Sequence, residues 1–349
     1  MPVKNKKKPI KTKEPRAPQL PSFNRPKSRV IAITGIRSFI GSNLLQRLQQ
    51  EGRHQIVALD LEKPDFLKPS TRFYKLDLTS TTADVTLSEI LEREKCDTFI
   101  HLAFLSSPTH KSSYAHELES VGTMYIFHAC AKNKIKKLII SSTTMVYGAL
   151  PINPNFLVEE SPLRGNRNFR PIRDRIEVEE QAHGFQKKHP DMIITMLRTC
   201  TILGPTIRNF ITTYLGLPVI TTLLGYDPLM QLVHEEDAID AFRLAVERDC
   251  RGVFNIVGRG VLPLSTIIKL SGKIKAPILH ALAYPMVDGL WLSQVGIAPS
   301  GYLDYIRYLW VADGTKARKE LGFFPKYSTK ETLETFLGIQ RLRAIHLVE

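Results

Sequence analysis

The sequence lacks the cysteine patterns that bind zinc or cross-link small secreted proteins. Its four cysteines, Cys96, Cys130, Cys200 and Cys250, are widely separated along the chain. No CxxC pair is present, so neither a metal site nor a disulfide framework is expected. No apolar run reaches the roughly 18 residues of a membrane-spanning helix, and the N-terminal residues lack the apolar centre of a secretory signal. These absences predict a soluble protein of the reducing cytoplasm.

Acidic residues are nearly absent from the N-terminus. The net charge is +14, but residues 1–29 hold ten lysines or arginines against the single acid Glu14, which places +9 there and leaves +5 for the rest of the chain. Six prolines and few large apolar side chains predict that residues 1–28 form a disordered basic tail. The tail is a solubilising extension or a tether to anionic lipid, acidic protein or nucleic acid. The rest of the chain shows no nucleic-acid-binding module, which disfavours that function as the main one.

Apolar runs alternate with helix-length segments from residue 29 onward. This alternation is typical of an α/β protein whose parallel sheet is covered on both faces. We predict a Rossmann-type doubly wound sheet, with an NAD-binding domain over residues 29–200. The expected strands are residues 30–33, 55–60, a short one near 73, 98–103, 137–142 and 193–197, and the expected helices are residues 86–95, 114–133 and 172–189.

The alternation of apolar runs and helix-length segments becomes less regular beyond Arg198. Residues 211–224 and 278–297 are apolar but interrupted by glycine and proline, while residues 235–247 and 329–340 have helical patterns. We predict that residues 201–349 form mainly a smaller substrate-binding domain, with segments near 234–257 returning to the main sheet.

A glycine-bearing turn follows the first expected strand. Residues 34–41 read TGIRSFIG and lead into a helix, which is where a dinucleotide's pyrophosphate is held. The first glycine permits the tight turn and the last lets the helix pack on the strand, while a serine replaces the usual middle glycine and its side chain must share the space near the phosphates. The predicted contacts are Gly35, Arg37, Ser38, Phe39, Ile40 and Gly41.

Asp60 follows this turn at the end of the second expected strand. A carboxylate there accepts hydrogen bonds from a ribose diol and repels a 2′-phosphate, which favours NAD. Arg37 points to the alternative, because a guanidinium can bind a 2′-phosphate and admit NADP.

Seven short strings occur in a fixed order along the chain. They are the TGxxxxxG loop, LDL at 76–78, IHLA at 100–103, SSTTMVYG at 141–148, LR at 197–198 with LGP at 203–205, VHEED at 233–237 and VFNI at 253–256. Over residues 30–340 the chain thereby resembles the extended short-chain dehydrogenase/reductase family, especially its NAD-dependent epimerase/dehydratase branch. The resemblance implies a Rossmann fold and NAD, with Asp77 and Leu78 near the adenine and Leu102 and Ala103 beside the pyrophosphate.

The resemblance also locates the family's catalytic positions. Thr143 matches the Ser or Thr that bonds the substrate oxygen. Arg175 stands at the family's lysine and Pro171 at its tyrosine, while Ser120 stands where many members have asparagine. Proline has no proton to exchange with an alcohol, although Arg175 can keep a positive charge near the ribose. The predicted catalytic residues are therefore Thr143 and Arg175.

Two replacements for the missing acid/base remain open. One is another side chain brought to the same space: Tyr147, Arg173, Asp174 or His183. The other is Thr143 acting through a water chain, with an arginine stabilising the oxyanion. As purely structural residues, Tyr147 would pack beside the cofactor, Arg173 and Asp174 would form a solvated helix start, and His183 would lie on a helix surface.

Two further histidines lie inside the family strings. For His101 and His234 we expect structural hydrogen bonds rather than metal binding.

Two functions follow. The first is an NAD(P)-dependent oxidoreductase or epimerase/dehydratase-like enzyme acting on a secondary alcohol of a nucleotide sugar or an apolar substrate. The alternative is a catalytically reduced NAD-binding sensor or scaffold. Expected partners are a small-molecule substrate and an anionic membrane that the basic tail contacts peripherally. The family resemblance also implies a second copy of the chain, packed through residues 114–133 and 172–189.

Overall fold

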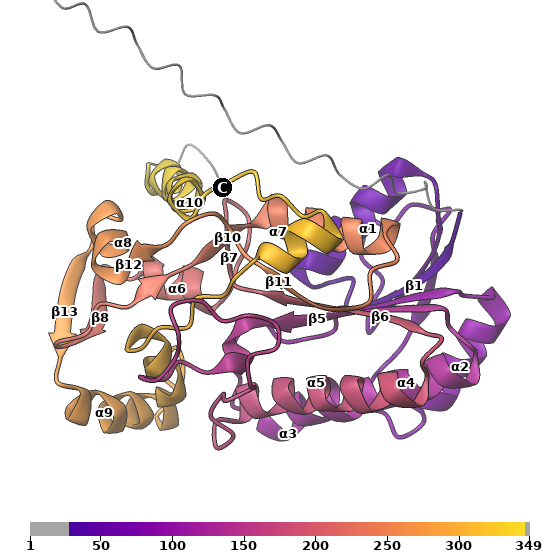
Figure 1. Ribbon diagram of the computed structural model, residues 1–349, viewed down its shortest axis with the longest axis horizontal. Coiled ribbons are helices and arrows are strands. Elements are labelled where there is room, and N and C mark those ends of the chain that lie inside the picture. The colour runs from indigo at the N-terminus through magenta and orange to yellow at the C-terminus, as the bar shows by residue number, and fades with distance from the viewer. Residues whose placement is uncertain (1–27, 346–349) are drawn as a thin grey trace, which may run out of the picture.

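A computed structural model describes residues 28–345, and the predicted basic tail lies outside them except for Ser28. Seven parallel strands form the main sheet in the order β11-β6-β5-β4-β1-β2-β3, which confirms the Rossmann-type prediction (Figure 1). The seventh strand is the predicted return of the chain near residue 254. The strands are β1 (Val30–Thr34), β2 (Gln55–Asp60), β3 (Arg72–Lys75), β4 (Thr98–His101), β5 (Lys137–Thr143), β6 (Ile193–Thr199) and β11 (Gly252–Ile256).

Helices cover both faces of this sheet (Figure 1). Alternate side chains of β1 pack on opposite faces of the sheet, because successive side chains of a strand point in opposite directions. Ile31 and Ile33 pack in one apolar cluster with Leu44, whereas Ala32 packs in a second cluster with Ile126. The helices of the first face are α1 (Phe39–Glu51) and α7 (Glu235–Glu247), and those of the second are α2 (Ala83–Glu94), α4 (Gly122–Lys132) and α5 (Arg170–Lys188).

The single helix expected over residues 114–133 contains a change of winding. It consists of α3 (Ser112–His116), a π-helical turn over Glu117–Val121 and α4. Such turns are rare, and they frequently occur at functional sites. Here the turn holds Glu119 and Ser120, which bond to different segments, as described below.

The C-terminal part lies beyond the carboxyl end of β6 and contains three two-stranded sheets. They are β7 (Thr201–Leu203) with β10 (Leu232–His234), β8 (Val219–Leu223) with β13 (Ile274–Ile278), and β9 (Leu229–Met230) with β12 (Leu262–Pro263). Its helices are α6 (Phe210–Gly216), α8 (Leu264–Leu270), α9 (His280–Leu292) and α10 (Thr329–Ala344), with a 3-10 helix over Ser300–Ile306 and a π-helical turn over Ala317–Leu321. Within residues 28–345, no helix combines the length and apolarity needed to span a bilayer.

Candidate active site

The turn between β1 and α1 needs glycine at two positions. Gly35 has a φ of +72°, and a Cβ there would lie 2.4 Å from the carbonyl carbon of Leu102. A Cβ on Gly41 would lie 2.0 Å from the carbonyl oxygen of Gly35. Both distances are far below van der Waals contact, so any other residue would force the loop, the helix or the 102–103 backbone apart.

Ser38 caps α1 with its side chain turned back into the loop. Its hydroxyl donates to the Gly35 carbonyl at 2.7 Å and accepts from the Gly41 amide at 3.1 Å. The side chain was expected to share the space near the phosphates, but both of its hydrogen bonds instead stay within the turn. Within residues 28–345, the amides of Phe39 and Ile40 have no acceptor, so two donors at the positive end of the helix dipole remain free for an anion.

Asp60 ties the end of β2 to the same loop. Its carboxylate accepts from the Arg37 amide at 3.0 Å and from the Leu61 amide at 2.8 Å. The Arg37 guanidinium turns to the exposed Glu62, 2.7 Å away. This corner therefore carries two carboxylates against one cation, a balance that disfavours a further anion such as a 2′-phosphate.

The other predicted cofactor residues hydrogen-bond or pack against neighbouring segments of the chain. Asp77 is exposed and its carboxylate accepts from the amide and hydroxyl of Thr79, at 2.9 and 2.7 Å. Leu78 is buried against Gly122, and Leu102 and Ala103 form the backbone against which Gly35 packs.

One cavity of about 470 Å³ joins the start of α1, the end of β5, the start of α5 and the C-terminal part. Of the predicted cofactor residues, Ser38, Phe39, Ile40 and Leu102 line it; Gly35, Arg37, Gly41, Asp60, Asp77, Leu78 and Ala103 do not. Both predicted catalytic residues, Thr143 and Arg175, also line it, as does Pro171.

Thr143 and Pro171 each have a local structural role in the cavity wall. The Thr143 hydroxyl accepts from the Met145 amide at 3.3 Å and so caps the 3-10 helix over Thr144–Tyr147. Pro171 lies in the first turn of α5, where its missing amide hydrogen leaves no helical bond unmade.

Arg175 is held by its neighbours rather than free in the cavity. Its Nη2 donates to the Leu105 carbonyl at 3.0 Å and lies 3.2 Å from Oε1 of Glu119, and the guanidinium stacks 4.2 Å above the Phe104 ring. Glu119 also accepts from the Leu105 amide at 2.7 Å. Burial raises the pKa of Glu119, while the charge of Arg175 opposes that shift. Glu119 could not be predicted as a cavity residue from the sequence, because it lies in a π-helical turn that regular helical spacing does not anticipate.

Tyr302 is a second cavity residue that the sequence analysis missed. Its ring packs edge-on against Phe169, with centroids 4.8 Å apart, and tilts against Phe210 at 4.4 Å. Its phenolic oxygen has no hydrogen-bond partner within residues 28–345. Burial raises the pKa of Tyr302, and the charge of Arg175 opposes that shift. Tyr302 lies far beyond Pro171 in the chain, so no local spacing could have found it.

Tyr147, an acid/base candidate from the sequence, lies in a buried hydrogen-bond network and does not line the cavity. Its hydroxyl donates to Asn255 at 2.8 Å and accepts from Arg198 at 2.6 Å. Arg198 in turn donates to both carboxylate oxygens of Glu179, each at 3.0 Å from its Nε. The phenol therefore links the 3-10 helix after β5 to β6 and β11.

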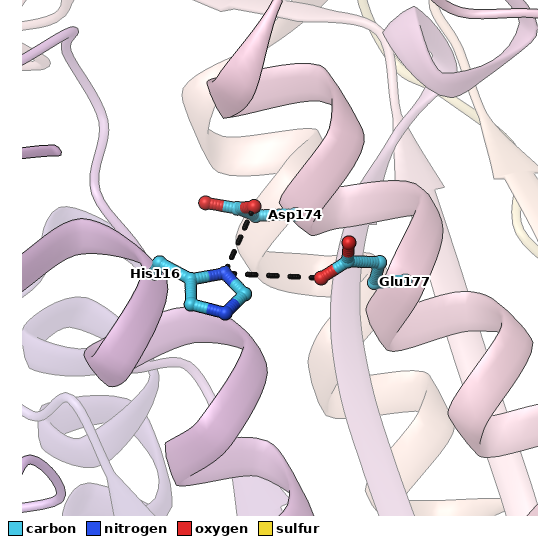
Figure 2. A group of neighbouring side chains, drawn as sticks. All are labelled: His116, Asp174 and Glu177. Atoms are coloured by element: carbon cyan, nitrogen blue, oxygen red, sulfur yellow. Dashed lines mark hydrogen bonds and ion pairs between the residues drawn. The ribbon is translucent and has the colours of Figure 1, made fainter. Parts of the chain in front are cut away.

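The expectation of a solvated helix start at Arg173 and Asp174 is wrong for Asp174, which is buried. Figure 2 shows His116 of α3 facing Asp174 and Glu177 of α5, at 3.1 and 3.8 Å from its Nδ1. Arg173 lies 3.0 Å from Asp174 and 3.5 Å from Glu177, so a cation of the chain already neutralises these carboxylates. The cluster links α3 to α5 beside the cavity.

His183, Ser120 and His101 also have places in the structure that need no catalytic role. His183 is exposed on α5 and does not line the cavity. Ser120 donates to Glu177 at 3.0 Å and accepts from Gln181 at 3.2 Å. The ring nitrogens of His101 lie 2.9 and 3.0 Å from the hydroxyls of Thr34 and Thr123.

His234 caps α7 by accepting from the Glu236 amide at 3.2 Å. Both His101 and His234 therefore make the structural hydrogen bonds that the sequence predicted.

Comparisons with known proteins agree with this architecture. An uncharacterized protein of Mycobacterium tuberculosis is 30% identical over 320 residues, covering 88% of this chain and 83% of its own length. UDP-glucose 4-epimerase of Yersinia enterocolitica is 30% identical over 188 residues, which is 50% of this chain and 54% of the epimerase.

Solved structures share the fold at low identity. UDP-glucose 4-epimerase of Thermotoga maritima with UDP-glucose aligns with a TM-score of 0.68 and 20% identity, over 90% of this chain and 99% of its own. UDP-glucuronic acid 4-epimerase of Bacillus cereus in complex with NAD aligns with a TM-score of 0.66, 20% identity and the same coverage. The NAD dependent epimerase/dehydratase family matches residues 31–257, and the chain belongs to that family.

Proposed function

We propose that this chain is an NAD-dependent oxidoreductase that acts on a secondary alcohol. The observation that carries the proposal is a cavity lined by Phe39 and Ile40 of α1, by Thr143 and by Tyr302. Within residues 28–345, the amides of Phe39 and Ile40 and the Tyr302 phenol have no hydrogen-bond partner. Membership of an NAD-dependent family supports it, and so does the NAD complex of the similar Bacillus cereus epimerase. We also propose that residues 201–349 provide most of the substrate-binding part, since Phe210 and Tyr302 lie there.

The residues present fit a dinucleotide. The tight turn that Gly35 and Gly41 permit presents the amides of Phe39 and Ile40, which suit a pyrophosphate, and Asp60 suits an adenosine ribose. The Arg37–Glu62 pair favours NAD over NADP, because the arginine is already neutralised. When bound, the nicotinamide supplies the hydride acceptor.

Tyr302 is the proposed acid/base in place of the family's tyrosine. In the reducing direction the Tyr302 phenol would donate its proton to the carbonyl oxygen of the substrate while a bound, reduced nicotinamide would supply a hydride to the carbonyl carbon, and oxidation of the alcohol would reverse both transfers. Thr143 orients the reacting oxygen. Burial raises the pKa of Tyr302 and the charge of Arg175 opposes that rise only in part, so the neutral phenol is favoured and is suited to donating a proton.

The substrate side of the cavity favours an alcohol with an apolar body. Phe169, Ile207 and Phe210 line this side together with Trp291 and Tyr302. A purely polar sugar would leave these surfaces in contact with hydroxyl groups, whereas an apolar body removes them from water.

The test measures NADH formation by the full chain with NAD and a panel of secondary alcohols, from short-chain and polycyclic apolar alcohols to nucleotide sugars. We expect turnover with apolar alcohols and a KM that falls as the apolar body grows. Turnover with nucleotide sugars alone would contradict the substrate class. Absence of NADH formation with every alcohol, despite NAD binding, would contradict the oxidoreductase function.

That last outcome defines the second candidate, an NAD-binding sensor or scaffold. Pro171 and the Arg175–Glu119 pair favour it, because neither family catalytic position holds a group that can donate and regain a proton. NAD binding that changes the exposure of α9 or α5 to hydrogen exchange, with no NADH formed, would support the sensor.

A further inference from the structure

Helix α9 is apolar on nearly every side, yet the fold leaves it exposed. Ala283 is its only buried residue, while Leu282, Leu290 and Leu292 are 62%, 43% and 80% exposed. An apolar helix in a globular protein is normally buried in a core or against a partner. We call the following set of exposed side chains the α9 surface: Leu279, Leu282, Met286, Leu290, Leu292, Val295 and Ile297.

Lysines flank the α9 surface on its N-terminal side. Asp288 is the only charged side chain in residues 276–303, and its carboxylate accepts from the Ser300 amide at 3.1 Å. Upstream, Lys269, Lys273 and Lys275 lie on α8, its following turn and β13. Figure 1 shows α8, β13 and α9 following one another down one edge of the molecule. An apolar strip and a cationic strip therefore share that edge, and Ile274, 66% exposed, lies between two of the lysines.

The α9 surface borders the cavity. Trp291 of α9 and Pro299 after it both line the cavity wall. The Trp291 ring stacks on His110 with centroids 3.6 Å apart, which joins α9 to the segment before α3. A body that covered the α9 surface would therefore lie beside the cavity.

We propose that the α9 surface docks onto an anionic lipid bilayer, with its apolar side chains in the boundary between headgroups and acyl chains and the three lysines at the headgroup phosphates. A 13-residue helix is about 20 Å long, which suits a helix lying in the plane of the interface. Apolar transfer and attraction between lysines and anionic lipids act together in such binding.

A second copy of the chain fits this edge less well than a bilayer does. Two copies joined through the α9 surface would bring like-charged lysine strips toward each other, and like charges at an interface oppose association. An anionic bilayer carries the complementary charge. The docking is separate from the proposed chemistry, because it requires neither NAD nor turnover.

The first test is sedimentation of the full chain with phosphatidylcholine vesicles that contain or lack phosphatidylglycerol. The double variant Leu282→Glu, Leu290→Glu places two charges on the α9 surface and leaves the basic N-terminus intact. Val85→Glu, Val158→Glu, at positions 52% and 44% exposed, adds the same two charges outside the α9 surface and is the matched control. We expect the double variant to lose about tenfold or more in partitioning onto anionic vesicles, because two apolar side chains no longer leave water, and the control to match the wild type.

The second test uses the two tryptophans. Trp310 is buried and donates to the Tyr305 carbonyl, whereas Trp291 lies in α9. Brominated acyl chains in phosphatidylglycerol-containing vesicles should therefore quench the wild-type emission, and Trp291→Phe should remove the quenched component. The thermal unfolding midpoint of each variant checks that it is folded.

Three results would overturn the proposal. The double variant could sediment with anionic vesicles to the same extent as the wild type. That result would assign the vesicle binding to the N-terminal residues. Brominated lipid could leave the emission unchanged in a sedimenting protein. Lastly, sedimentation velocity without vesicles could reveal a dimer that the double variant loses, with no vesicle binding by either form, which would assign the surface to a second copy.

Discussion

The two ends of the cavity are built from segments with very different separations in the chain. At the anion-binding end, β1, the turn and the start of α1 supply the glycine cradle and the free amides within residues 30–41. At the proposed catalytic end, Glu119, Arg175 and Tyr302 come from a π-helical turn, from α5 and from a 3-10 helix that are distant from one another in the sequence. The first end depends on local backbone geometry. The second depends on how the C-terminal part packs against the sheet. Substitutions at one end should therefore change NAD affinity, and substitutions at the other should change kcat.

The largest expected effect is at the catalytic end. Tyr302→Phe removes the proposed proton-transfer group and keeps the ring against Phe169 and Phe210. We expect kcat to fall roughly 10²- to 10⁴-fold with NAD affinity unchanged. Steady-state kinetics and calorimetry measure the two quantities. Tyr305→Phe is the control: its hydroxyl donates to the Met145 carbonyl and it does not line the cavity, so it should lower stability and spare kcat.

A Tyr302→Phe enzyme that keeps wild-type kcat would remove this residue from the mechanism and return attention to Thr143 and a water chain.

The next effect is at the anion-binding end. Gly41→Val places a branched side chain against the Gly35 carbonyl, 2.0 Å from the position of its Cβ. We expect NAD affinity to fall roughly 100-fold through displacement of the turn, as measured by calorimetry. Gly184→Ala in α5, where a Cβ meets nothing within 4 Å, should bind NAD normally and raise the free energy of unfolding by about 1 kcal/mol. Equal NAD affinity in wild type and Gly41→Val would place the dinucleotide elsewhere.

A further effect concerns the strand between the two ends and changes stability rather than affinity or turnover. Burial lowers the pKa of His101 from 6.5 to about 3 in the folded state. Because the unfolded chain takes up this proton first as the pH falls, stability is lost from about pH 6.5 down toward pH 3, by about 1.4 kcal/mol per pH unit for one proton. Urea unfolding at several pH values should give a smaller acid loss for His101→Gln than for wild type. Parallel curves for the two proteins would contradict the shift.

The smallest effect concerns cofactor choice. Asp60→Asn removes a negative charge from the corner that Arg37 and Glu62 share. We expect the ratio of NAD to NADP affinity to fall about tenfold. Competition binding measures the ratio, and Asp65→Asn, an exposed neighbour, serves as control. A ratio unchanged by Asp60→Asn would show that this carboxylate does not select the cofactor.

The same contrast explains what the sequence could predict. The apolar strands, the glycine turn at Gly35 and Gly41 and the helix after it depend on neighbouring residues, and the structure contains each of them as predicted. Tyr302 was not found because its place depends on the packing of a 3-10 helix against Phe169 and Phe210. Glu119 was not found because regular helical periodicity does not anticipate a π-helical turn. The apolar character of residues 278–297 was evident, but periodicity could not tell that α9 would remain exposed.

The most direct test of the account is titration calorimetry of the cofactor-free full chain with NAD and, separately, NADP. The account predicts a saturable heat for one NAD per chain, weaker binding of NADP, and loss of that heat in Gly41→Val. Absence of heat with both dinucleotides, for a protein shown to be folded by its thermal unfolding transition, would contradict it.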